Sequence, residues 1–208
     1  MNTEMQSTNG VASGDGISLP RETQAVNECA ASQFALVAYI PDPLGRFLDD
    51  LRLELTPGCR PHAHVTVLPP RPLDHEVSET VRQINEGLKC AAPFRVDLGE
   101  IEIFDTSHVV YLGVKRGYME LLQFYSALNC GCLSYTEPFP YHPHITIAQN
   151  VTAEDAARLA AVASERWADY DGPRSFEVAS LSFVQQVAPN VWVDVAKVPV
   201  GAPVPVAG

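Results

Sequence analysis

Two short segments of the chain share a pattern of residue types suited to acid–base chemistry. The letters HAHVTV begin at His62, and HPHITI begin at His142. Both segments read H-x-H-x-T followed by an aliphatic residue. The chain has only 6 histidines, so a chance repetition of this pattern is not expected. The doubled pattern is therefore the first candidate for a functional site.

The spacing of each segment determines which side chains can act together. Side chains at positions i, i+2 and i+4 of a β-strand point to the same face. If both segments are strands, His64 shares a face with Thr66, and His144 shares a face with Thr146. The valines and isoleucines between them then point into a core. Two such strands that face each other would present two His–Thr pairs across one cleft.

Such an arrangement suits the cleavage of a phosphodiester. Near pH 7 a neutral imidazole can accept a proton and an imidazolium can donate one. One histidine would activate the nucleophile, and the other would protonate the leaving oxygen. Threonine hydroxyls can donate hydrogen bonds to the non-bridging phosphate oxygens. This chemistry requires neither a metal ion nor a cofactor.

The elements that must position these residues occur in a repeated order. The first half of the chain predicts a strand at 34–40, a helix at 43–55, a strand at 62–68 ended by Pro69 and Pro70, a helix at 75–89 capped by Asp74, and one or two strands at 94–104. The second half predicts a strand at 108–115, a helix at 119–128, a strand at 142–148, a helix from Thr152 to about 169 with a partial capping box at Asp155, and strands at 175–187 and 191–198 turned at Pro189-Asn190.

The repeated strand–helix–strand–helix–strand order predicts a duplicated fold. We expect an α+β, bilobal structure with pseudo-two-fold duplicated antiparallel sheets and flanking helices around a central cleft. The domain should span 33–198, with one lobe at about 33–105, a second at about 106–198, and exchange of strands between them allowed. Residues 1–32 and 199–208 lack periodic hydrophobicity and are expected to be flexible tails.

The two motifs resemble those of a known family. His64-Val65-Thr66-Val67 and His144-Ile145-Thr146-Ile147 are similar to the paired H-x-[ST]-aliphatic motifs of the two-histidine (2H) phosphoesterase superfamily, close to the RNA 2′,5′-ligase or cyclic phosphodiesterase branch. The run HVTVLPPR, from His64 to Arg71, resembles a continuation typical of that family. The resemblance covers about 34–198.

The resemblance implies a metal-independent phosphodiesterase. It implies that His64 and His144 are the catalytic acid and base, with His144 as base and His64 as acid, and that Thr66 and Thr146 bind the phosphate. Family members often open 2′,3′-cyclic phosphates to the 2′-phosphate. The expected substrate is then a small nucleotide or the phosphodiester at an RNA end.

The chain departs from the family after the second motif. Many relatives carry Arg or Lys there, whereas this chain has Ala148-Gln149-Asn150. A cationic phosphate contact would then come from Arg71 or Arg60, although a solvated arginine is the simpler interpretation of each. Among the neighbours of the motifs, Tyr141 is a candidate for stacking on a base. His62 and His142 are candidates for a supporting contact or for exposed strand entries.

Composition narrows the class of partner. The chain has 14 Lys plus Arg against 25 Asp plus Glu, a net charge of −11. Long nucleic acid is bound through many cationic contacts, so it is not expected here, while one local basic pocket for a small anion is compatible with this charge.

No apolar run approaches the ~20 residues of a membrane helix, and the polar first residues lack the pattern of a signal peptide. We therefore expect a cytoplasmic monomer whose 5 cysteines are reduced and mostly buried.

Three alternative functions remain open from the sequence. The paired H-x-H segments could hold a metal ion in a metal-dependent hydrolase, although the nearest carboxylates, Asp74 and Glu137, lie in predicted loops. A non-catalytic nucleotide- or RNA-binding module on the same fold is a second alternative. Ligation of RNA ends is a third, and it would suit a more basic surface.

Overall fold

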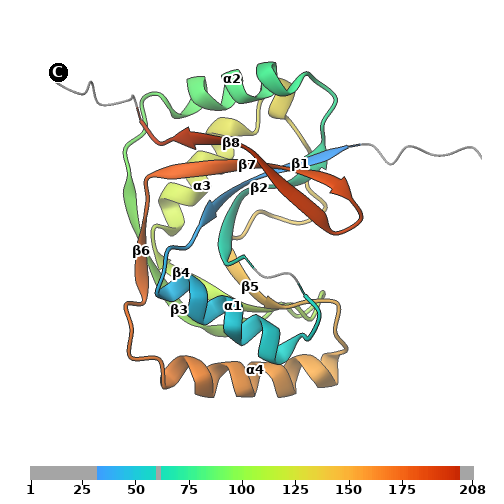
Figure 1. The fold of residues 1–208 in the computed structure, drawn as a ribbon, viewed down its shortest axis with the longest axis vertical. Helices are drawn as coiled ribbons and strands as arrows, with labels where there is room; N and C mark the ends of the chain where they lie inside the picture. Colours follow the sequence, from blue (N-terminus) through green and yellow to red (C-terminus); the bar gives the residue numbers. More distant parts are fainter. Residues whose placement is uncertain (1–31, 60–61, 202–208) are drawn as a thin grey trace, which may run out of the picture. The chain divides into compact units, whose positions relative to one another are not determined.

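The computed structural model describes residues 32–59 and 62–201, which lie in one compact unit. Four α-helices and eight strands follow one another along the chain (Figure 1). They are β1 (Gln33–Tyr39), α1 (Leu44–Leu55), β2 (His64–Pro72), α2 (Val77–Leu88), β3 (Phe94–Ile103), β4 (Val110–Arg116), α3 (Tyr118–Leu128), β5 (His144–Ala148), α4 (Ala153–Ala168), β6 (Ser175–Val178), β7 (Ser180–Ala188) and β8 (Val191–Pro199). A 3-10 turn (Gly131–Leu133) lies between α3 and β5.

The strands form two antiparallel four-stranded sheets. Sheet A has the order β2-β1-β7-β8, and sheet B has the order β5-β4-β3-β6. Each sheet takes strands from both halves of the chain, because β3 joins β4 in sheet B while β7 and β8 join β1 in sheet A. The motif strands β2 and β5 occupy one edge of each sheet. The predicted fold class is confirmed by this arrangement.

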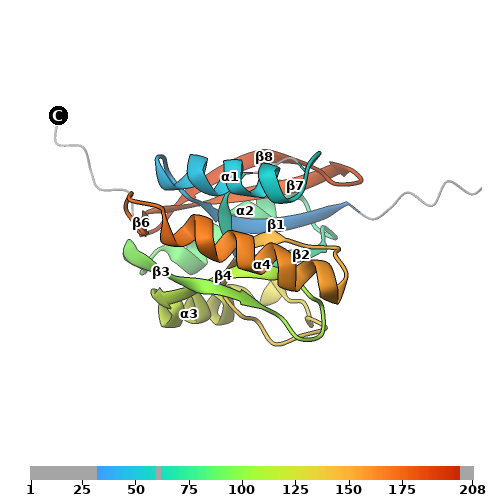
Figure 2. The same ribbon diagram turned by 90° about the horizontal axis from the view of Figure 1, so that it is seen from below.

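The helices pack on the sheets in two pairs. Helices α1 and α4 contact each other and lie against sheet B, whereas α2 and α3 contact each other and lie against sheet A (Figures 1 and 2). Their apolar faces meet alternate side chains of the strands in one continuous core, which includes Leu36, Val65, Ile145 and Trp167. The opposite face of each sheet is left for the site.

Strand β2 is longer than the sequence predicts. It continues through Pro69 and Pro70 to Pro72. Proline lacks an N–H and cannot donate to a sheet ladder, but it is tolerated in an edge strand, where one side has no partner strand. The pairing of β2 with β1 is also irregular at this end, because its register shifts between Phe34 and Val37. The expectation that these prolines end the strand was wrong for that reason.

The predicted strand at 175–187 is in fact two strands of different sheets. Residues Ser175–Val178 pair with β3 in sheet B, and Ser180–Ala188 pair with β1 in sheet A. The chain crosses between the sheets at Ala179. Periodicity cannot show this crossing, because both segments alternate in burial along an unbroken run of β-prone residues. The turn at Pro189-Asn190 is as predicted, with Asn190 in the left-handed region at φ 59°.

The two predicted helix caps had different outcomes. Thr152 caps α4, and its hydroxyl accepts a hydrogen bond from the Asp155 backbone N–H at 3.1 Å, as predicted. Asp74 does not cap α2, because that helix begins only at Val77, after Glu76. The expected burial of the cysteines was also wrong. Cys90 and Cys130 are exposed, Cys59 and Cys132 are half-buried, and Cys29 lies outside the described residues.

Within the described ranges, no helix is both long enough and apolar enough to cross a lipid bilayer.

Candidate active site

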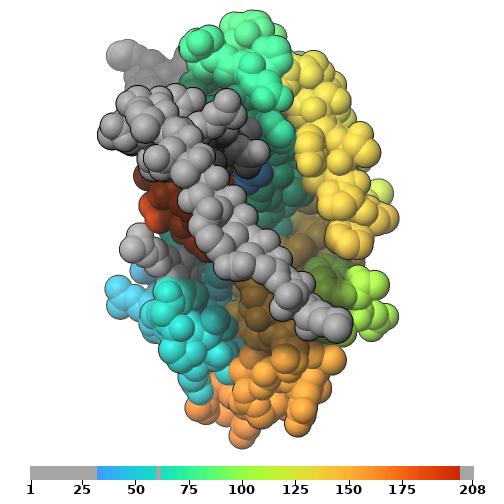
Figure 3. Space-filling model, turned by 90° about the vertical axis from the view of Figure 1, so that its right-hand side faces the viewer, coloured from blue at the N-terminus to red at the C-terminus, as the bar shows by residue number. Residues whose placement is uncertain are grey.

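The motif strands β2 and β5 approach each other where the edges of the two sheets meet. Along both strands the side chains alternate as predicted. His64 and Thr66 are half-buried on the open face of β2, and Val65 between them is fully buried. His144 and Thr146 occupy the same positions on β5. Figure 3 shows both strands recessed relative to the segment that leads into β5, drawn in yellow.

Each motif histidine is held in the same way. His64 Nδ1 lies 2.6 Å from the backbone oxygen of His62, and His144 Nδ1 lies 2.7 Å from the backbone oxygen of His142. A carbonyl oxygen only accepts hydrogen bonds, so Nδ1 must carry a proton in both rings. The nitrogen that gains or loses a proton is therefore Nε2, in both histidines. This fixed tautomer is what a general acid or base requires.

Burial favours the neutral form of both imidazole rings. It lowers the pKa of His64 to about 4, opposed by the hydrogen bond to the backbone oxygen of His62. Burial also lowers the pKa of His144, opposed by its hydrogen bond to His142. Both imidazoles are thus neutral near pH 7 in the free protein.

The first histidine of each motif, His62 or His142, packs against an aromatic side chain. His62 is exposed and stacks on the ring of Tyr39, with centroids 3.6 Å apart and planes inclined by 12°. The His142 ring lies edge-on to Phe104 and Tyr111, and its Nδ1 is 3.4 Å from the Tyr118 hydroxyl. These two residues, predicted as supporting contacts or strand entries, thus lie beside the site.

A tyrosine–carboxylate pair lies next to each motif. The Tyr39 hydroxyl donates to Asp194 at 2.7 Å, and the Tyr111 hydroxyl donates to Glu102 at 3.0 Å. Burial and the bond to Glu102 raise the pKa of Tyr111 to about 12. Both hydroxyls remain protonated at neutral pH and keep their rings fixed beside the histidines.

Tyr141, expected to stack on a base, connects the two motif strands. Its hydroxyl donates to the backbone oxygen of Thr66 at 2.7 Å. One face of its ring is covered by Tyr125, with centroids 4.3 Å apart. The other residues around it, which include Tyr135, Glu137 and Phe139, line a hollow of about 530 Å³. Tyr141 therefore positions β2 against the segment that precedes β5.

Arg71 does not have either of the environments considered for it. Its side chain is 1% exposed, so it is not a solvated arginine. The guanidinium donates to the side chains of Asn129 and Glu137 and to the backbone oxygens of Leu133 and Pro69. These interior partners engage four of the five N–H donors of Arg71, so no phosphate contact is assigned to it. The other candidate, Arg60, lies outside the described residues.

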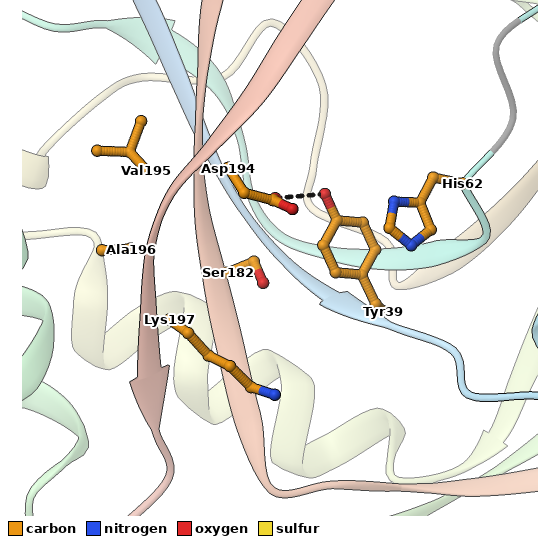
Figure 4. A pocket seen from close by; sticks show the side chains of 7 residues that line it. All are labelled: Tyr39, His62, Ser182, Asp194, Val195, Ala196 and Lys197. Atoms are coloured by element: carbon orange, nitrogen blue, oxygen red, sulfur yellow. Dashed lines mark hydrogen bonds between the residues drawn. The ribbon is translucent and has the colours of Figure 1, made fainter.

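Several residues near the site do not belong to any recognisable sequence motif. Tyr39, Asp194 and Lys197 come from β1 and β8, far apart in the chain, and gather beside His62 (Figure 4). Only the pairing of β1 with β7, and of β7 with β8, brings them together. Phe104 and Tyr111, beside the second motif, likewise belong to no sequence motif. Their positions do not match that of Tyr39, because Tyr39 lies opposite His64 whereas Tyr111 lies opposite Thr146.

The H-x-H pairs do not converge on one point. In the part of the chain that the structure describes, no three His, Cys, Asp or Glu side chains gather in a way that could hold a metal ion. The rings of His142 and His144 are 6.4 Å apart. Among the described residues, neither H-x-H pair is joined by a third potential ligand.

Comparison with known proteins identifies the family. The model of the 2′-5′ RNA ligase superfamily matches residues 40–190. The chain belongs to this superfamily. The match includes both motif strands, so the resemblance to the two-histidine phosphoesterases is confirmed. The superfamily comprises phosphoesterases and ligases that act on nucleotide phosphodiesters.

Solved structures show the same fold at low sequence identity. TT0787 of Thermus thermophilus aligns with a TM-score of 0.58 and 17% identity, over 81% of this chain and 97% of that one. LigT of E. coli, in its apo form, aligns with a TM-score of 0.56 and 16% identity, over 82% of this chain and 98% of that one. Usb1 of Kluyveromyces marxianus aligns with a TM-score of 0.50 and 15% identity, over 81% and 97%. No curated protein matches the sequence.

Proposed function

We propose that this protein is a metal-independent phosphodiesterase that opens 2′,3′-cyclic phosphates, or cleaves related phosphodiesters, of small nucleotides. The observation that carries the proposal is the matched pair of histidines. Each has its Nδ1 proton bonded to the backbone oxygen two residues earlier, so that each can exchange a proton through Nε2. Two such groups on facing strands are what a concerted acid–base cleavage needs.

The proposed reaction is the attack of water on phosphorus. One histidine takes a proton from the water as its oxygen bonds to phosphorus. The other histidine, protonated, gives its proton to the 3′ oxygen as the bond between that oxygen and phosphorus breaks. The products are a 2′-phosphate and a free 3′ hydroxyl. Thr66 and Thr146 donate hydrogen bonds to the non-bridging oxygens, where negative charge is held.

The acid–base order can be assigned in two ways. The family resemblance gives the base role to His144 and the acid role to His64. The opposite order, with His144 as the acid, fits the geometry equally well, because both rings have Nε2 free for proton transfer. A bound phosphate carries negative charge, which raises the pKa of both rings. We keep the family assignment as the working one and test it below.

Small nucleotides are the favoured substrates. Structures of E. coli LigT, a fold relative, are described as complexes with 3′-AMP and with phosphate. The net charge of −11 disfavours the many phosphate contacts of a long RNA. The same charge favours hydrolysis over ligation of RNA ends. We further propose that the catalytic domain spans 33–198 and that the protein acts as a cytoplasmic monomer.

The decisive experiment incubates the purified protein with 2′,3′-cyclic AMP in EDTA and follows phosphorus by NMR. We expect ring opening and a 2′-phosphate product. The double variant His64→Ala/His144→Ala, made in the same way, controls for a contaminating nuclease. Activity that appears only after a divalent metal is added would instead support the metal-dependent hydrolase. Binding of 2′,3′-cyclic AMP without any turnover would support the non-catalytic module.

A further inference from the structure

A second binding feature lies on sheet A beside the candidate catalytic pair. It is a shallow pocket of about 310 Å³, which we call the Lys197 pocket, lined by Tyr39, His62, Ser182, Asp194, Val195, Ala196 and Lys197. The Tyr39 ring lies between this pocket and His64, edge-on to the His64 ring with centroids 6.3 Å apart. Figure 4 shows Tyr39, Ser182, Asp194 and Lys197 gathered from β1, β7 and β8, with His62 on the segment that leads into β2. The pocket therefore continues the candidate active site.

A bulge in β8 brings the two charged groups of this pocket together. Asp194 and Lys197 are three residues apart, so in an unbroken strand their side chains would point to opposite faces. The pairing with β7 shifts at this point: Phe183 lies opposite Ala196, and Val184 lies opposite Asp194. The extra residue, Val195, turns the strand so that both side chains reach the same pocket. Bulges commonly re-aim side chains next to active sites.

The strand register relates Lys197 to the candidate phosphate site. Thr66 lies opposite Val37, Val37 opposite Ser182, and Ser182 opposite Lys197. These residues form one row across all four strands of sheet A. With strands about 4.8 Å apart, the row places the Lys197 Cα about 14 Å from the Thr66 Cα. A ligand held at Thr66 and extending along the row would reach the Lys197 amine.

The pocket holds one ammonium group, Lys197, and one carboxylate, Asp194. Lys197 is exposed, and among the described residues no carboxylate lies within ion-pair distance of its amine, so the ammonium is available to an anion. Seven of the eleven other Lys and Arg side chains in the described residues form ion pairs. Asp194, in the same pocket, accepts a hydrogen bond from the Tyr39 hydroxyl. It lies opposite Val184, which is two residues further along β7 than Ser182. The Ser182 hydroxyl, directly opposite Lys197, can donate to the same anion.

We propose that the Lys197 pocket binds a second phosphate of the substrate, one attached to the same nucleoside as the scissile phosphodiester. The preferred substrates are then nucleotides that carry a further phosphate, rather than cyclic phosphates of a bare nucleoside. This inference rests on the proposed function, which places the scissile phosphate at Thr66 and Thr146. Lys197 acts as a specificity residue and takes no part in proton transfer.

The kinetic test compares two substrates that differ in one group. Adenosine 2′,3′-cyclic phosphate and its 5′-phosphorylated form are each hydrolysed by the wild type, Lys197→Met, Lys197→Arg and Lys89→Met. Lys89 is an exposed lysine outside the pocket and serves as the matched control. We expect kcat/KM of the wild type to be about tenfold or more higher for the 5′-phosphorylated substrate, as for a hydrogen bond to a charged group. Lys197→Met should reduce this ratio to about one, whereas Lys197→Arg and Lys89→Met should keep it.

A binding test separates this inference from the proposed reaction. Adenosine 5′-monophosphate and adenosine, neither of which can be hydrolysed at a cyclic phosphate, are titrated into the wild type and Lys197→Met by calorimetry. We expect the monophosphate to bind about tenfold more tightly than adenosine, and only when Lys197 is present. Equal affinities, no measurable binding of either compound, or a preference that survives in Lys197→Met would overturn the inference. A failure of the protein to open any cyclic phosphate would overturn the proposed function without deciding this binding result.

Discussion

The two halves of the candidate site share a motif but differ in the walls around it. On sheet A, His64 adjoins an open pocket with an ammonium group and an exposed histidine stacked on Tyr39. On sheet B, His144 lies against the stacked rings of Phe104 and Tyr111, whose centroids are 4.0 Å apart. The hydrogen-bond geometry of the two motif histidines is thus duplicated, while the proposed site for a second phosphate lies on sheet A alone. The predictions below test where this symmetry holds and where it ends.

The largest effect is expected from the two catalytic candidates. His64→Ala and His144→Ala should each lower kcat for 2′,3′-cyclic AMP by at least about 100-fold, the low end for a lost acid–base step. Circular dichroism and thermal melts would establish that each variant folds. A variant that keeps wild-type turnover would remove that histidine from the proposed mechanism.

The leaving group can assign the two roles. A nucleoside 3′-phosphodiester with a nitrophenyl leaving group does not need a general acid, because nitrophenolate leaves without protonation. With His64 as the acid, His64→Ala should regain most of its lost rate on this substrate, and His144→Ala should not. The reverse pattern would mean that His144 is the acid and His64 is the base.

The threonines should show a smaller loss that is equal in the two halves. Thr66→Ala and Thr146→Ala each remove one hydrogen bond to a charged phosphate, worth about 1–3 kcal/mol or about 5- to 150-fold in kcat/KM. Serine at either position keeps the hydroxyl and should keep most of the activity. If only one of the two alanine variants is impaired, the phosphate is held asymmetrically.

The lowered histidine pKa values predict how stability depends on pH. Both rings bind protons less readily in the folded chain than in the unfolded chain. Between about pH 6.5 and 4 the unfolded state therefore binds more protons, and the free energy of unfolding should fall as the pH falls through this window. Urea titrations of the wild type and His64→Gln across the window would measure this, with a smaller slope expected for the variant. Equal slopes would show that His64 does not have a lowered pKa.

The smallest effect concerns the two tyrosine–carboxylate pairs. Tyr111→Phe removes a partly buried hydrogen bond to Glu102 and should lower the free energy of unfolding by about 1 kcal/mol. Tyr39→Phe removes a more exposed hydrogen bond to Asp194 and should lower the free energy of unfolding by only about a few tenths of a kcal/mol. Thermal melts of the two variants would rank them. The opposite ranking would mean that the Tyr39–Asp194 hydrogen bond contributes more to stability than the Tyr111–Glu102 hydrogen bond.

The sequence was sufficient for those parts of the molecule that depend on local patterns. Alternation in the motif segments predicts which side chains point away from the core, and Thr152 and Asp155 predict the start of α4. The sequence could not show the crossing at Ala179, because a strand that changes sheets has the same periodicity as one that does not. It could not show the burial of Arg71 either, since its partners lie about 60 residues away. The Lys197 pocket depends on a bulge in β8, which leaves no local signal.

The exchange of strands between the sheets has a consequence for how the chain folds. Strand β1 has β2 as one neighbour and β7 as the other, and β7 is among the last elements of this domain to be synthesised. Sheet A therefore cannot close around His64 until nearly the whole domain has been synthesised. Such long-range pairings slow folding, because the entropy of closing a large loop is lost before the contacts form. Until then one edge of β1 lacks its partner strand, a state in which nascent chains are prone to aggregate.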